Sequence, residues 1–434
     1  MTGIIEPAPL GGTLRQVIAS KSQAHRLLIC AALADRPTRL RNIPPSRDAE
    51  ATCRCLRALG ADMTHEADAV TVFPLGLGQA GSPLLDCGES GSTLRFLLPV
   101  AAALEADCAF TGQGKLSQRP LEPLYSELAA HGAVLSPEGA FPLRCRGKLR
   151  GGAYRLAGNV SSQFISGLLL ALPLLEEDSE IHILGSLESA PYVDMTLCAL
   201  ESFGIVWEQL APRATEESRV YRFSAGQRFR SPGNLSVEAD WSGAAFFLAA
   251  GALSEKGITC LGLNPDSPQG DRRILSLLTA FGADVKTDGT SVSCRYAPLH
   301  GIDVDAADIP DLVPVLSAVA AYALGETRIR NIRRLRLKES DRVASVLAMI
   351  RGLGGAAESS DNEMIIHGLG SLPGGRVDAF RDHRIAMAAA VAASRADGPT
   401  EIQGIEAADK SYPDFFTRWQ ELGGNIACKE ERDI

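Results

Sequence analysis

Leu59-Gly60-Ala61 ends a stretch of helical sequence and leads into two short strand-like pieces. This arrangement decides the fold, because it recurs six times along the chain. The six steps are Leu59-Gly60-Ala61, His131-Gly132-Ala133, Phe203-Gly204-Ile205, Phe281-Gly282-Ala283, Leu353-Gly354-Gly355 and Leu422-Gly423-Gly424. Glycine at such a step is typical of a left-handed helix C-cap that turns the chain into a strand. The sequence therefore predicts a helix that ends before each glycine.

A second, more apolar helix alternates with the first. Its six copies are expected to begin near Lys21, Ser90, Ser161, Trp241, Asp311 and Asp382, a period of about 70 residues. These helices are apolar on almost every side, which indicates burial. A strand follows several of them, most clearly in residues 40–43, Leu-Arg-Asn-Ile, and 329–332, Ile-Arg-Asn-Ile. Each unit reads as helix, strand, helix, strand, strand, which is an α/β (or α+β) pattern.

The six units divide into two groups of three. The join at Phe229-Arg230-Ser231-Pro232-Gly233-Asn234 is rich in turn-forming residues and suits a hinge. We therefore expect one domain at residues 20–232 and a second at residues 1–19 together with 233–434, with the chain's first strand completing a sheet of the second domain. If the buried helices of each domain lie parallel, their polar starts face one another across a cleft.

The starts of these helices carry the first indication of function. N-capping accounts for a Ser or Asp at such a position. It does not account for Lys21 and Arg384, because the helix dipole disfavours a cation there by roughly 0.3 kcal/mol or more unless an anion lies beside it. Lys21 and Arg384 therefore indicate sites for small anions. The fourth start, Asp240-Trp241-Ser242, carries no cation and is interpreted as structural.

Composition sets limits on the function. The 434 residues are 45% hydrophobic and 22% charged, with a formal net charge of −9, which argues against nucleic acid as the main partner. The ten cysteines include no CxxC pair and are expected to be free thiols in a reducing cytoplasm, with no metal site. The N-terminus does not resemble a signal peptide, and the apolar run from Phe164 to Leu175 is too short to cross a membrane.

Nine short motifs, in order, cover the chain from about residue 10 to its end. They are Ser20-Lys21-Ser22-x-x-x-Arg26, Gly91-Ser92-x-x-Arg95, Gln118-Arg119-Pro120, Ser161-Ser162-Gln163, Pro191-Tyr192-Val193-Asp194, Ile309-Pro310-Asp311, Leu337-Lys338-Glu339-Ser340-Asp341-Arg342, Asp382-His383-Arg384 and Lys410-x-x-Pro413-Asp414. Each is weak alone, but the ordered series resembles the 5-enolpyruvylshikimate-3-phosphate synthase family.

The resemblance implies two domains, each of three βαβαββ units around buried parallel helices. It also implies transfer of the enolpyruvyl group of phosphoenolpyruvate to the 5-hydroxyl of shikimate 3-phosphate, with release of phosphate and no metal or organic cofactor. Both substrates are small anions, so Arg and Lys are the residue types that the site needs. No nucleic acid or membrane partner is expected, and the protein is expected to be a monomer.

The resemblance also implies the roles of individual residues. Lys21, Asp311 and Glu339 are the expected proton-transfer residues, with Asp311 as the base toward the hydroxyl. Shikimate 3-phosphate is expected to bind Lys21, Ser22, Arg26, Ser161, Ser162, Gln163, Ser189, Tyr192, Asp311 and Lys338. Phosphoenolpyruvate is expected to bind Lys21, Gly91, Arg119, Gln163, Glu339, Arg342, His383, Arg384 and Lys410. The alternative readings are a helix cap for Asp311 and a solvated pair for Lys338 and Glu339.

Departures from the family pattern leave two competing functions to weigh. Glu89 stands where the family often has Asn, Phe96 where it commonly has Pro, and Arg334 where it usually has Asn. UDP-N-acetylglucosamine enolpyruvyl transferase shares the fold and donor, but it typically has a reactive Cys in the loop that corresponds to residues 112–119, which contains none here. A non-catalytic anion-binding homologue is the other alternative, and retention of Lys21, Asp311 and Glu339 argues against it.

Overall fold

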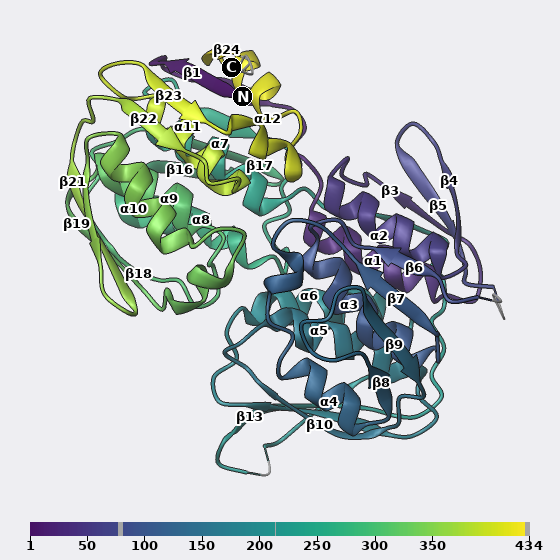
Figure 1. The fold of residues 1–434 in the computed structure, drawn as a ribbon. Helices are drawn as coiled ribbons and strands as arrows, with labels where there is room; N and C mark the ends of the chain where they lie inside the picture. Colours follow the sequence, from purple (N-terminus) through teal and green to yellow (C-terminus); the bar gives the residue numbers. More distant parts are fainter. Residues whose placement is uncertain (77–80, 213, 430–434) are drawn as a thin grey trace, which may run out of the picture. The chain divides into compact units, whose positions relative to one another are not determined.

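The computed structural model describes residues 1–76, 81–212 and 214–429. The chain forms two compact units, one made of Met1–Ser20 with Glu238–Ile434 and the other of Lys21–Val237 (Figure 1). We call the first the discontinuous unit and the second the continuous unit, and each is described by itself.

The six predicted glycine steps are confirmed. The helices that end at them are α2 (Arg47–Ala58), α4 (Leu124–Ala130), α6 (Ala190–Ser202), α8 (Ile274–Phe281), α10 (Arg342–Gly352) and α12 (Phe415–Glu421). Gly60, Gly132, Gly204, Gly282, Gly354 and Gly423 all have a positive φ, between 74° and 108°. Only glycine adopts this backbone conformation at no steric cost, so each step ends its helix and turns the chain toward the strands that follow.

The more apolar helices begin within two residues of their predicted starts. They are α1 (Lys21–Ala32), α3 (Gly91–Ala103), α5 (Ser162–Ala171), α7 (Trp241–Ala252), α9 (Val313–Tyr322) and α11 (His383–Ala393). Every residue of α9 and of α11 is buried. In the discontinuous unit α7, α9 and α11 pack against one another, and in the continuous unit α5 packs against α3 and α6. Their small apolar side chains let the helices approach closely and form the cores.

Three four-stranded sheets cover the helices of the continuous unit. Their strand orders are β14 (Asn234–Ser236), β3 (Thr38–Arg41), β5 (Ala69–Phe73), β4 (Asp62–His65); β6 (Leu84–Asp86), β7 (Cys108–Thr111), β9 (Leu143–Gly147), β8 (Ala133–Leu135); and β10 (Gly152–Ala157), β11 (Ser179–Leu184), β13 (Glu217–Phe223), β12 (Glu208–Leu210). The first two strands of each sheet are parallel and the other pairs are antiparallel.

Three sheets of the same pattern belong to the discontinuous unit. Their orders are β2 (Gly12–Leu14), β15 (Ile258–Cys260), β17 (Ser291–Arg295), β16 (Asp284–Asp288); β18 (Asp303–Asp305), β19 (Leu324–Arg330), β21 (Glu363–Leu369), β20 (Ala356–Ser359); and β22 (Gly375–Asp378), β23 (Thr400–Gln403), β1 (Thr2–Glu6), β24 (Asn425–Lys429). In the second and third of these sheets a buried helix joins the two parallel strands, α9 between β18 and β19 and α11 between β22 and β23. In the first sheet β2 pairs with β15, the strand that follows the buried helix α7. Likewise, in the continuous unit β14 pairs with β3, the strand that follows α1.

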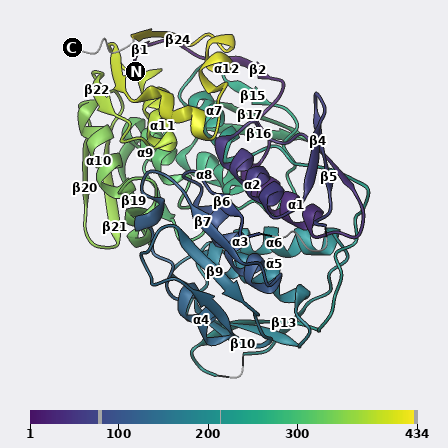
Figure 2. The ribbon, with the colours of Figure 1, turned by 45° about the vertical axis from the view of Figure 1, so that its right-hand side comes forward.

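The two connecting segments explain where the units divide. β1 pairs with both β23 and β24, and Figure 2 shows β1 next to β24, so the first strand completes a sheet of the discontinuous unit. β14 pairs with β3, which places the end of the continuous unit at Val237, a few residues beyond the predicted position 232. The segments that follow β2 and β14 run side by side: the Asp240 amide donates to the Ile18 carbonyl and the Ser20 amide to the Glu238 carbonyl, each at 2.8 Å.

Within the described residues, none of the helices combines the length and the apolar character needed to cross a membrane.

Candidate active site

Arg342 lies at the centre of a cluster of charged side chains in the discontinuous unit. It is the first residue of α10, and only 1% of its side chain is exposed. Its guanidinium donates from Nη1 to Oδ1 of Asp311 at 2.6 Å and from Nη2 to Oε2 of Glu339 at 2.7 Å. The third donor, Nε, lies 2.9 Å from Oδ2 of Asp382. A planar guanidinium presents its donors in a fixed fork, so Arg342 holds the two carboxylates predicted to move protons, Asp311 and Glu339, on one group.

Neighbouring charges decide the ionisation of this cluster. Burial alone would lower the pKa of Arg342, but the three carboxylates around it hold that pKa well above its usual value. Burial alone would raise the pKa of Asp311, but the charges of Arg384, Lys338 and Arg342 outweigh burial and hold it well below its usual value. Asp311 is therefore a carboxylate at neutral pH.

Arg384 and Lys338 also face Asp311. Arg384, the second residue of α11, donates from Nη2 to Oδ2 of Asp311 at 3.0 Å and from Nη1 to its carbonyl at 3.2 Å. The Lys338 ammonium lies 3.6 Å from Oδ1 of Asp311, and burial lowers the pKa of Lys338. The N-cap of α9 is Leu312, so Asp311 does not cap that helix. Lys338 and Glu339 are half-buried rather than a solvated pair.

His383 and Lys410 complete the predicted residues of the discontinuous unit. His383 is 2% exposed, and its Nδ1 lies 3.9 Å from Oδ1 of Asp382, the N-cap of α11. Lys410 is half-buried at the end of the 3-10 helix η5 (Ile405–Lys410), which packs against α11. Both residues therefore belong to the same helical layer as Arg384.

In the continuous unit, the cation at the start of α1 is paired with a carboxylate of the protein. The Lys21 ammonium lies 2.8 Å from Oδ2 of Asp48, and the two side chains are only 20% and 12% exposed. Asp48 stands in the first turn of α2, where the helix dipole favours a carboxylate. Arg384 is matched by Asp311 in the same way. The protein itself therefore supplies an anion beside each of these cations, so the helix dipoles of α1 and α11 do not by themselves require a bound ligand.

Arg119 is placed differently. It follows the 3-10 helix η1 (Leu116–Gln118), and within the described parts of the chain its buried Nε has no hydrogen-bond partner. A Cβ atom at Gly91 would lie only 2.6 Å from Nη1 of Arg119, so the missing side chain of Gly91 lets this guanidinium rest on the first turn of α3. A cation at the positive end of a helix dipole favours binding of an anion beside it.

Gln163 is held at the start of α5 by residues of α3. Nη1 of Arg95 donates to Oε1 of Gln163 at 2.6 Å, and Nε2 of Gln163 donates to Oγ of Ser92 at 2.9 Å. Nη2 of Arg95 donates to the carbonyl of Pro120 at 2.9 Å, next to Arg119. Arg95 thus positions two of the predicted phosphoenolpyruvate-binding residues.

Arg26 has a larger structural role than the sequence indicates. It is 2% exposed, and burial lowers its pKa to about 10. Nε donates to Oγ1 of Thr196 at 2.7 Å, Nη1 to the Ser22 carbonyl at 2.5 Å and Nη2 to the Tyr192 carbonyl at 2.7 Å. Nη2 also donates to Oγ of Ser166 at 3.2 Å. Together these bonds tie α1 to α5 and α6 and leave one Nη1 hydrogen without a described acceptor, so any contact of Arg26 with substrate uses a small part of its donor capacity.

The remaining predicted residues of the continuous unit lie at helix starts. Ser161 caps α5, its Oγ accepting from the Gln163 amide at 3.3 Å, and Ser162 follows it with 7% exposure. Ser189 is the N-cap of α6 and is 3% exposed, with a left-handed backbone at φ 57°. A left-handed non-glycine residue is costly, and such strain is found at functional sites.

Comparison with known proteins agrees with the resemblance in the motifs. A family model described as EPSP synthase (3-phosphoshikimate 1-carboxyvinyltransferase) matches residues 4–419. Proteins named 3-phosphoshikimate 1-carboxyvinyltransferase from Clostridium kluyveri and Clostridium acetobutylicum are 40% and 41% identical to this chain, over 97% of it and 97% of each relative. The chain belongs to the EPSP synthase family.

Solved structures agree with this family assignment. An EPSP synthase from Acinetobacter baumannii has a TM-score of 0.81 at 25% identity, with 98% of this chain and 100% of that chain covered. The enolpyruvyl transferase NikO from Streptomyces tendae has a TM-score of 0.77 at 17% identity, over 98% of both chains, which shows a common fold. The predicted enolpyruvyl-transferase-like fold of two three-unit domains is therefore confirmed.

Two departures from the EPSP synthase pattern have visible packing roles. Phe96 is 1% exposed, and the guanidinium carbon of Arg26 lies 4.9 Å from its ring centre. The ring of His25 meets Phe96 edge-on at 6.3 Å, and burial lowers the pKa of that histidine to about 3. The exposed Glu89 packs its carboxylate where any side chain at Gly114 would lie, so it shapes the loop that ends at Arg119.

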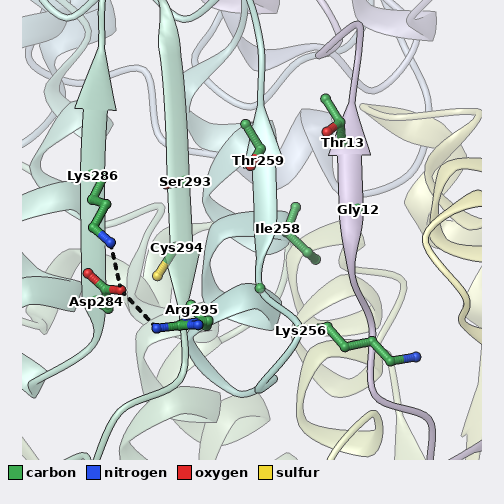
Figure 3. A pocket seen from close by; sticks show the side chains of 11 residues that line it. Gly12, Thr13, Lys256, Ile258, Thr259, Asp284, Lys286, Ser293, Cys294 and Arg295 are labelled. Carbon is green, nitrogen blue, oxygen red and sulfur yellow. Dashed lines mark hydrogen bonds and ion pairs between the residues drawn. The ribbon is translucent and has the colours of Figure 1, made fainter.

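A hollow elsewhere in the discontinuous unit holds none of these residues. It has a volume of about 350 Å³ and lies over the sheet of β2, β15, β17 and β16 (Figure 3). The Asp284 carboxylate there pairs with Lys286 at 3.2 Å and with Arg295 at 3.5 Å, so two of the cations in the hollow already have a partner within the protein.

Three residues that organise the predicted site were not predicted from the sequence: Asp48, Asp382 as a partner of Arg342, and Arg95. Arg95 and Asp382 stand inside the motifs, where each was open to a simpler explanation. Asp48 lies 27 positions from Lys21, and no local pattern connects them.

Proposed function

We propose that this protein transfers the enolpyruvyl group of phosphoenolpyruvate to the 5-hydroxyl of shikimate 3-phosphate and releases phosphate. Family membership at about 40% identity over nearly the whole chain supports the reaction. The single structural observation that supports this function is that the Arg342 guanidinium donates hydrogen bonds to both Asp311 and Glu339. The cluster joins proton acceptors to cations, which is what addition to an anionic enol requires.

The reaction has two halves. In the first, the hydroxyl of shikimate 3-phosphate loses its proton and attacks the central carbon of phosphoenolpyruvate, whose methylene carbon gains a proton, giving a tetrahedral ketal. In the second, a proton leaves the new methyl group and phosphate departs, which restores the carbon–carbon double bond and gives the enol ether product. We assign removal of the hydroxyl proton to Asp311 and proton traffic at the methylene carbon and the phosphate to Glu339 and Lys21.

Substrate charge helps to explain how Asp311 acts as a base. A carboxylate held by three cations has a low pKa and is a weak proton acceptor. Bound phosphate and carboxylate groups would take up part of the charge of Arg384, Lys338 and Arg342. The pKa of Asp311 would then rise toward its ordinary value, so substrate binding itself strengthens the base.

We propose that both units contribute residues to the same reaction. Shikimate 3-phosphate is assigned to Lys21, Ser22, Arg26, Ser161, Ser162, Gln163, Ser189, Tyr192, Asp311 and Lys338. Phosphoenolpyruvate is assigned to Lys21, Gly91, Arg119, Gln163, Glu339, Arg342, His383, Arg384 and Lys410. The open Nε of Arg119 beside the first turn of α3 supports its place in the donor site.

Phosphate release with two alternative acceptors tests the function. The protein is incubated with phosphoenolpyruvate and either shikimate 3-phosphate or UDP-N-acetylglucosamine, and phosphate is measured over time. Release with shikimate 3-phosphate alone is expected. Release with the nucleotide sugar alone would overturn the proposal, and binding of shikimate 3-phosphate without release would favour a non-catalytic anion-binding protein.

We further propose that the protein acts in the cytoplasm as a monomer. No disulfide joins any of the ten cysteines, all of which lie among the described residues, and eight of them are buried, which suits a reducing compartment. Sedimentation equilibrium at assay concentration is expected to give a mass close to the 46.0 kDa of one chain.

A further inference from the structure

Asp271 is a buried carboxyl group beside α7, the helix whose start the sequence indicates to be purely structural. It lies in the 3-10 helix η3 (Gly270–Arg273), which packs against α7 and α8. Asp271 is 2% exposed, and its Oδ2 accepts a hydrogen bond from Oγ of Ser242 in the first turn of α7. Its Oδ1 is also buried and has no hydrogen-bond partner among the residues that the structure describes. A buried carboxylate oxygen without a donor is costly, so the surroundings of Asp271 favour the neutral acid.

Asp271 lies within electrostatic range of the candidate active site. α7 packs against α9 and α11, at whose starts Asp311 and Arg384 are found. The charges of Asp311, Arg384 and Asp240, the N-cap of α7, act on Asp271, and η3 itself carries the cations Arg272 and Arg273. The other helix packed against η3, α8, contains only Ile, Leu, Ser, Thr, Ala and Phe and brings no titratable group. Two acidic groups, Asp271 and Asp311, therefore act on one guanidinium.

The protonation of Asp271 changes near neutral pH. Burial and the charge of Asp311 raise the pKa of Asp271 to about 7, while Arg384 and the Ser242 hydrogen bond oppose the shift. Asp271 is neutral below that pH and a carboxylate above it, whereas Asp311 is a carboxylate throughout the same range.

We propose that Asp271 is a positioning residue for the anion site at Arg384. As a neutral acid, Asp271 does not attract the Arg384 guanidinium, which then interacts with Asp311 and a bound substrate anion. As a carboxylate, it attracts the same guanidinium electrostatically, in competition with the substrate, and it repels the substrate's phosphate and carboxylate. The inference rests on the proposed function, in which Arg384 binds phosphoenolpyruvate, and it gives the fourth helix start a part in that site.

The test compares the KM for phosphoenolpyruvate of the parent and of Asp271→Asn at several values from about pH 6 to about pH 8.5. Asn keeps the shape and can accept from Ser242, but it cannot ionise. We expect similar KM values at the acidic end and a parent KM higher by roughly three- to tenfold at the alkaline end, because only the parent gains a charge there. Phosphoenolpyruvate titrates in both assays, so the ratio of the two KM values removes its contribution.

Ser242→Ala provides a second, independent variant. It removes the hydrogen bond that favours the charged form of Asp271. The rise in KM should therefore move to higher pH than in the parent. Asp266→Asn is the matched control, because Asp266 is an exposed carboxylate on the segment that precedes η3. Its KM should follow that of the parent at every pH.

The outcomes separate this inference from the proposed function. A parent that releases no phosphate at any pH overturns the function. A parent that turns over, with a KM ratio to Asp271→Asn that stays constant with pH, overturns the role of Asp271. If Asp271→Asn does not fold, Ser242→Ala decides: a transition that stays in place or moves to lower pH contradicts the role, and one that moves to higher pH supports it.

Discussion

The ammonium nitrogen of Lys21 lies 2.8 Å from Oδ2 of Asp48, so the cation at the start of α1 meets a carboxylate at the start of α2. The dipole of α1 disfavours a cation at Lys21, and the dipole of α2 favours a carboxylate at Asp48. The ion pair therefore explains how a lysine is tolerated at the start of α1. It also sets a condition on the proposed catalysis. A substrate anion that approaches Lys21 competes with Asp48, so the ammonium is shared rather than free.

Lys21→Met should abolish turnover without unfolding the protein. Met keeps the length and apolar stem of the side chain but removes the charge and the proton, and we expect kcat to fall by about a thousandfold. Phosphate release and a thermal melt measure the two effects. Lys148→Met is the matched control, because Lys148 also pairs with carboxylates, Glu105 and Glu176, but is 51% exposed. Retained activity in Lys21→Met would remove Lys21 from the chemistry.

Gly91→Ala should weaken binding of phosphoenolpyruvate. The added Cβ would lie 2.6 Å from Nη1 of Arg119, so that guanidinium must move away from the first turn of α3. We expect KM for phosphoenolpyruvate to rise by about tenfold, since misplacing a binding group by about 1 Å is costly. Gly76→Ala is the control, because nothing lies within 4 Å of a Cβ built there. An unchanged KM in Gly91→Ala would mean that Arg119 does not hold the donor.

Glu89→Asn should alter substrate affinity more than stability. The Glu89 side chain is exposed, so its removal costs little folding energy, yet its carboxylate packs against Gly114 in the loop that ends at Arg119. Removing a negative charge near anion-binding residues should lower KM for phosphoenolpyruvate by roughly two- to fivefold. KM and the melting temperature are measured together, and a KM equal to that of the parent would make Glu89 a bystander.

The sequence predicts the repeated architecture well because each unit is specified locally. Gly60 and its five counterparts end helices through a left-handed backbone conformation, which a glycine at the end of a helical pattern predicts directly. The motifs also predict the members of the charged cluster, since Asp311, Glu339 and Arg342 do come together. The sequence does not predict which charged side chains are buried or which distant residues they pair with. Nothing near Asp271 in the sequence indicates a fully buried acid, and nothing near Arg26 indicates that its donors are used within the protein.

Arg342→Lys should lose both activity and stability. A lysine has one compact charge and no fixed fork, so it cannot hold Asp311, Glu339 and Asp382 together. Because the buried Asp382 and the half-buried Asp311 and Glu339 would lose the guanidinium that they share, we expect a loss of about 3–5 kcal/mol in the free energy of unfolding and a fall in kcat of at least about a hundredfold. Chemical denaturation and the phosphate assay measure these effects.

The control for Arg342 is an exposed pair of the same residue types. Arg328 lies 2.7 Å from Glu326, with 40% and 48% of the side chains exposed. Exposed pairs contribute little, so Arg328→Lys should change the free energy of unfolding by less than about 1 kcal/mol. Equal losses in the two variants would contradict the view that burial makes Arg342 the centre of the cluster.

Asp271→Asn should also change how stability depends on pH. In the unfolded chain Asp271 ionises near its ordinary pKa of 3.8, but in the folded protein it keeps its proton up to about pH 7. The folded state therefore binds more protons between these values, and the stability of the parent falls as pH rises through this window, by at most about 1.4 kcal/mol per pH unit from this group. Asn does not titrate, so the variant escapes that loss.

The difference in stability between Asp271→Asn and the parent should therefore be smallest near pH 4, should grow in favour of the variant up to about pH 7, and should then level off. Denaturant titrations at several pH values measure it, with Asp266→Asn as the exposed control. A difference that stays flat across this window would show that Asp271 ionises normally despite its burial. In that case the carboxylate would already act on Arg384 at acidic pH, and the KM for phosphoenolpyruvate would lose its predicted dependence on pH as well.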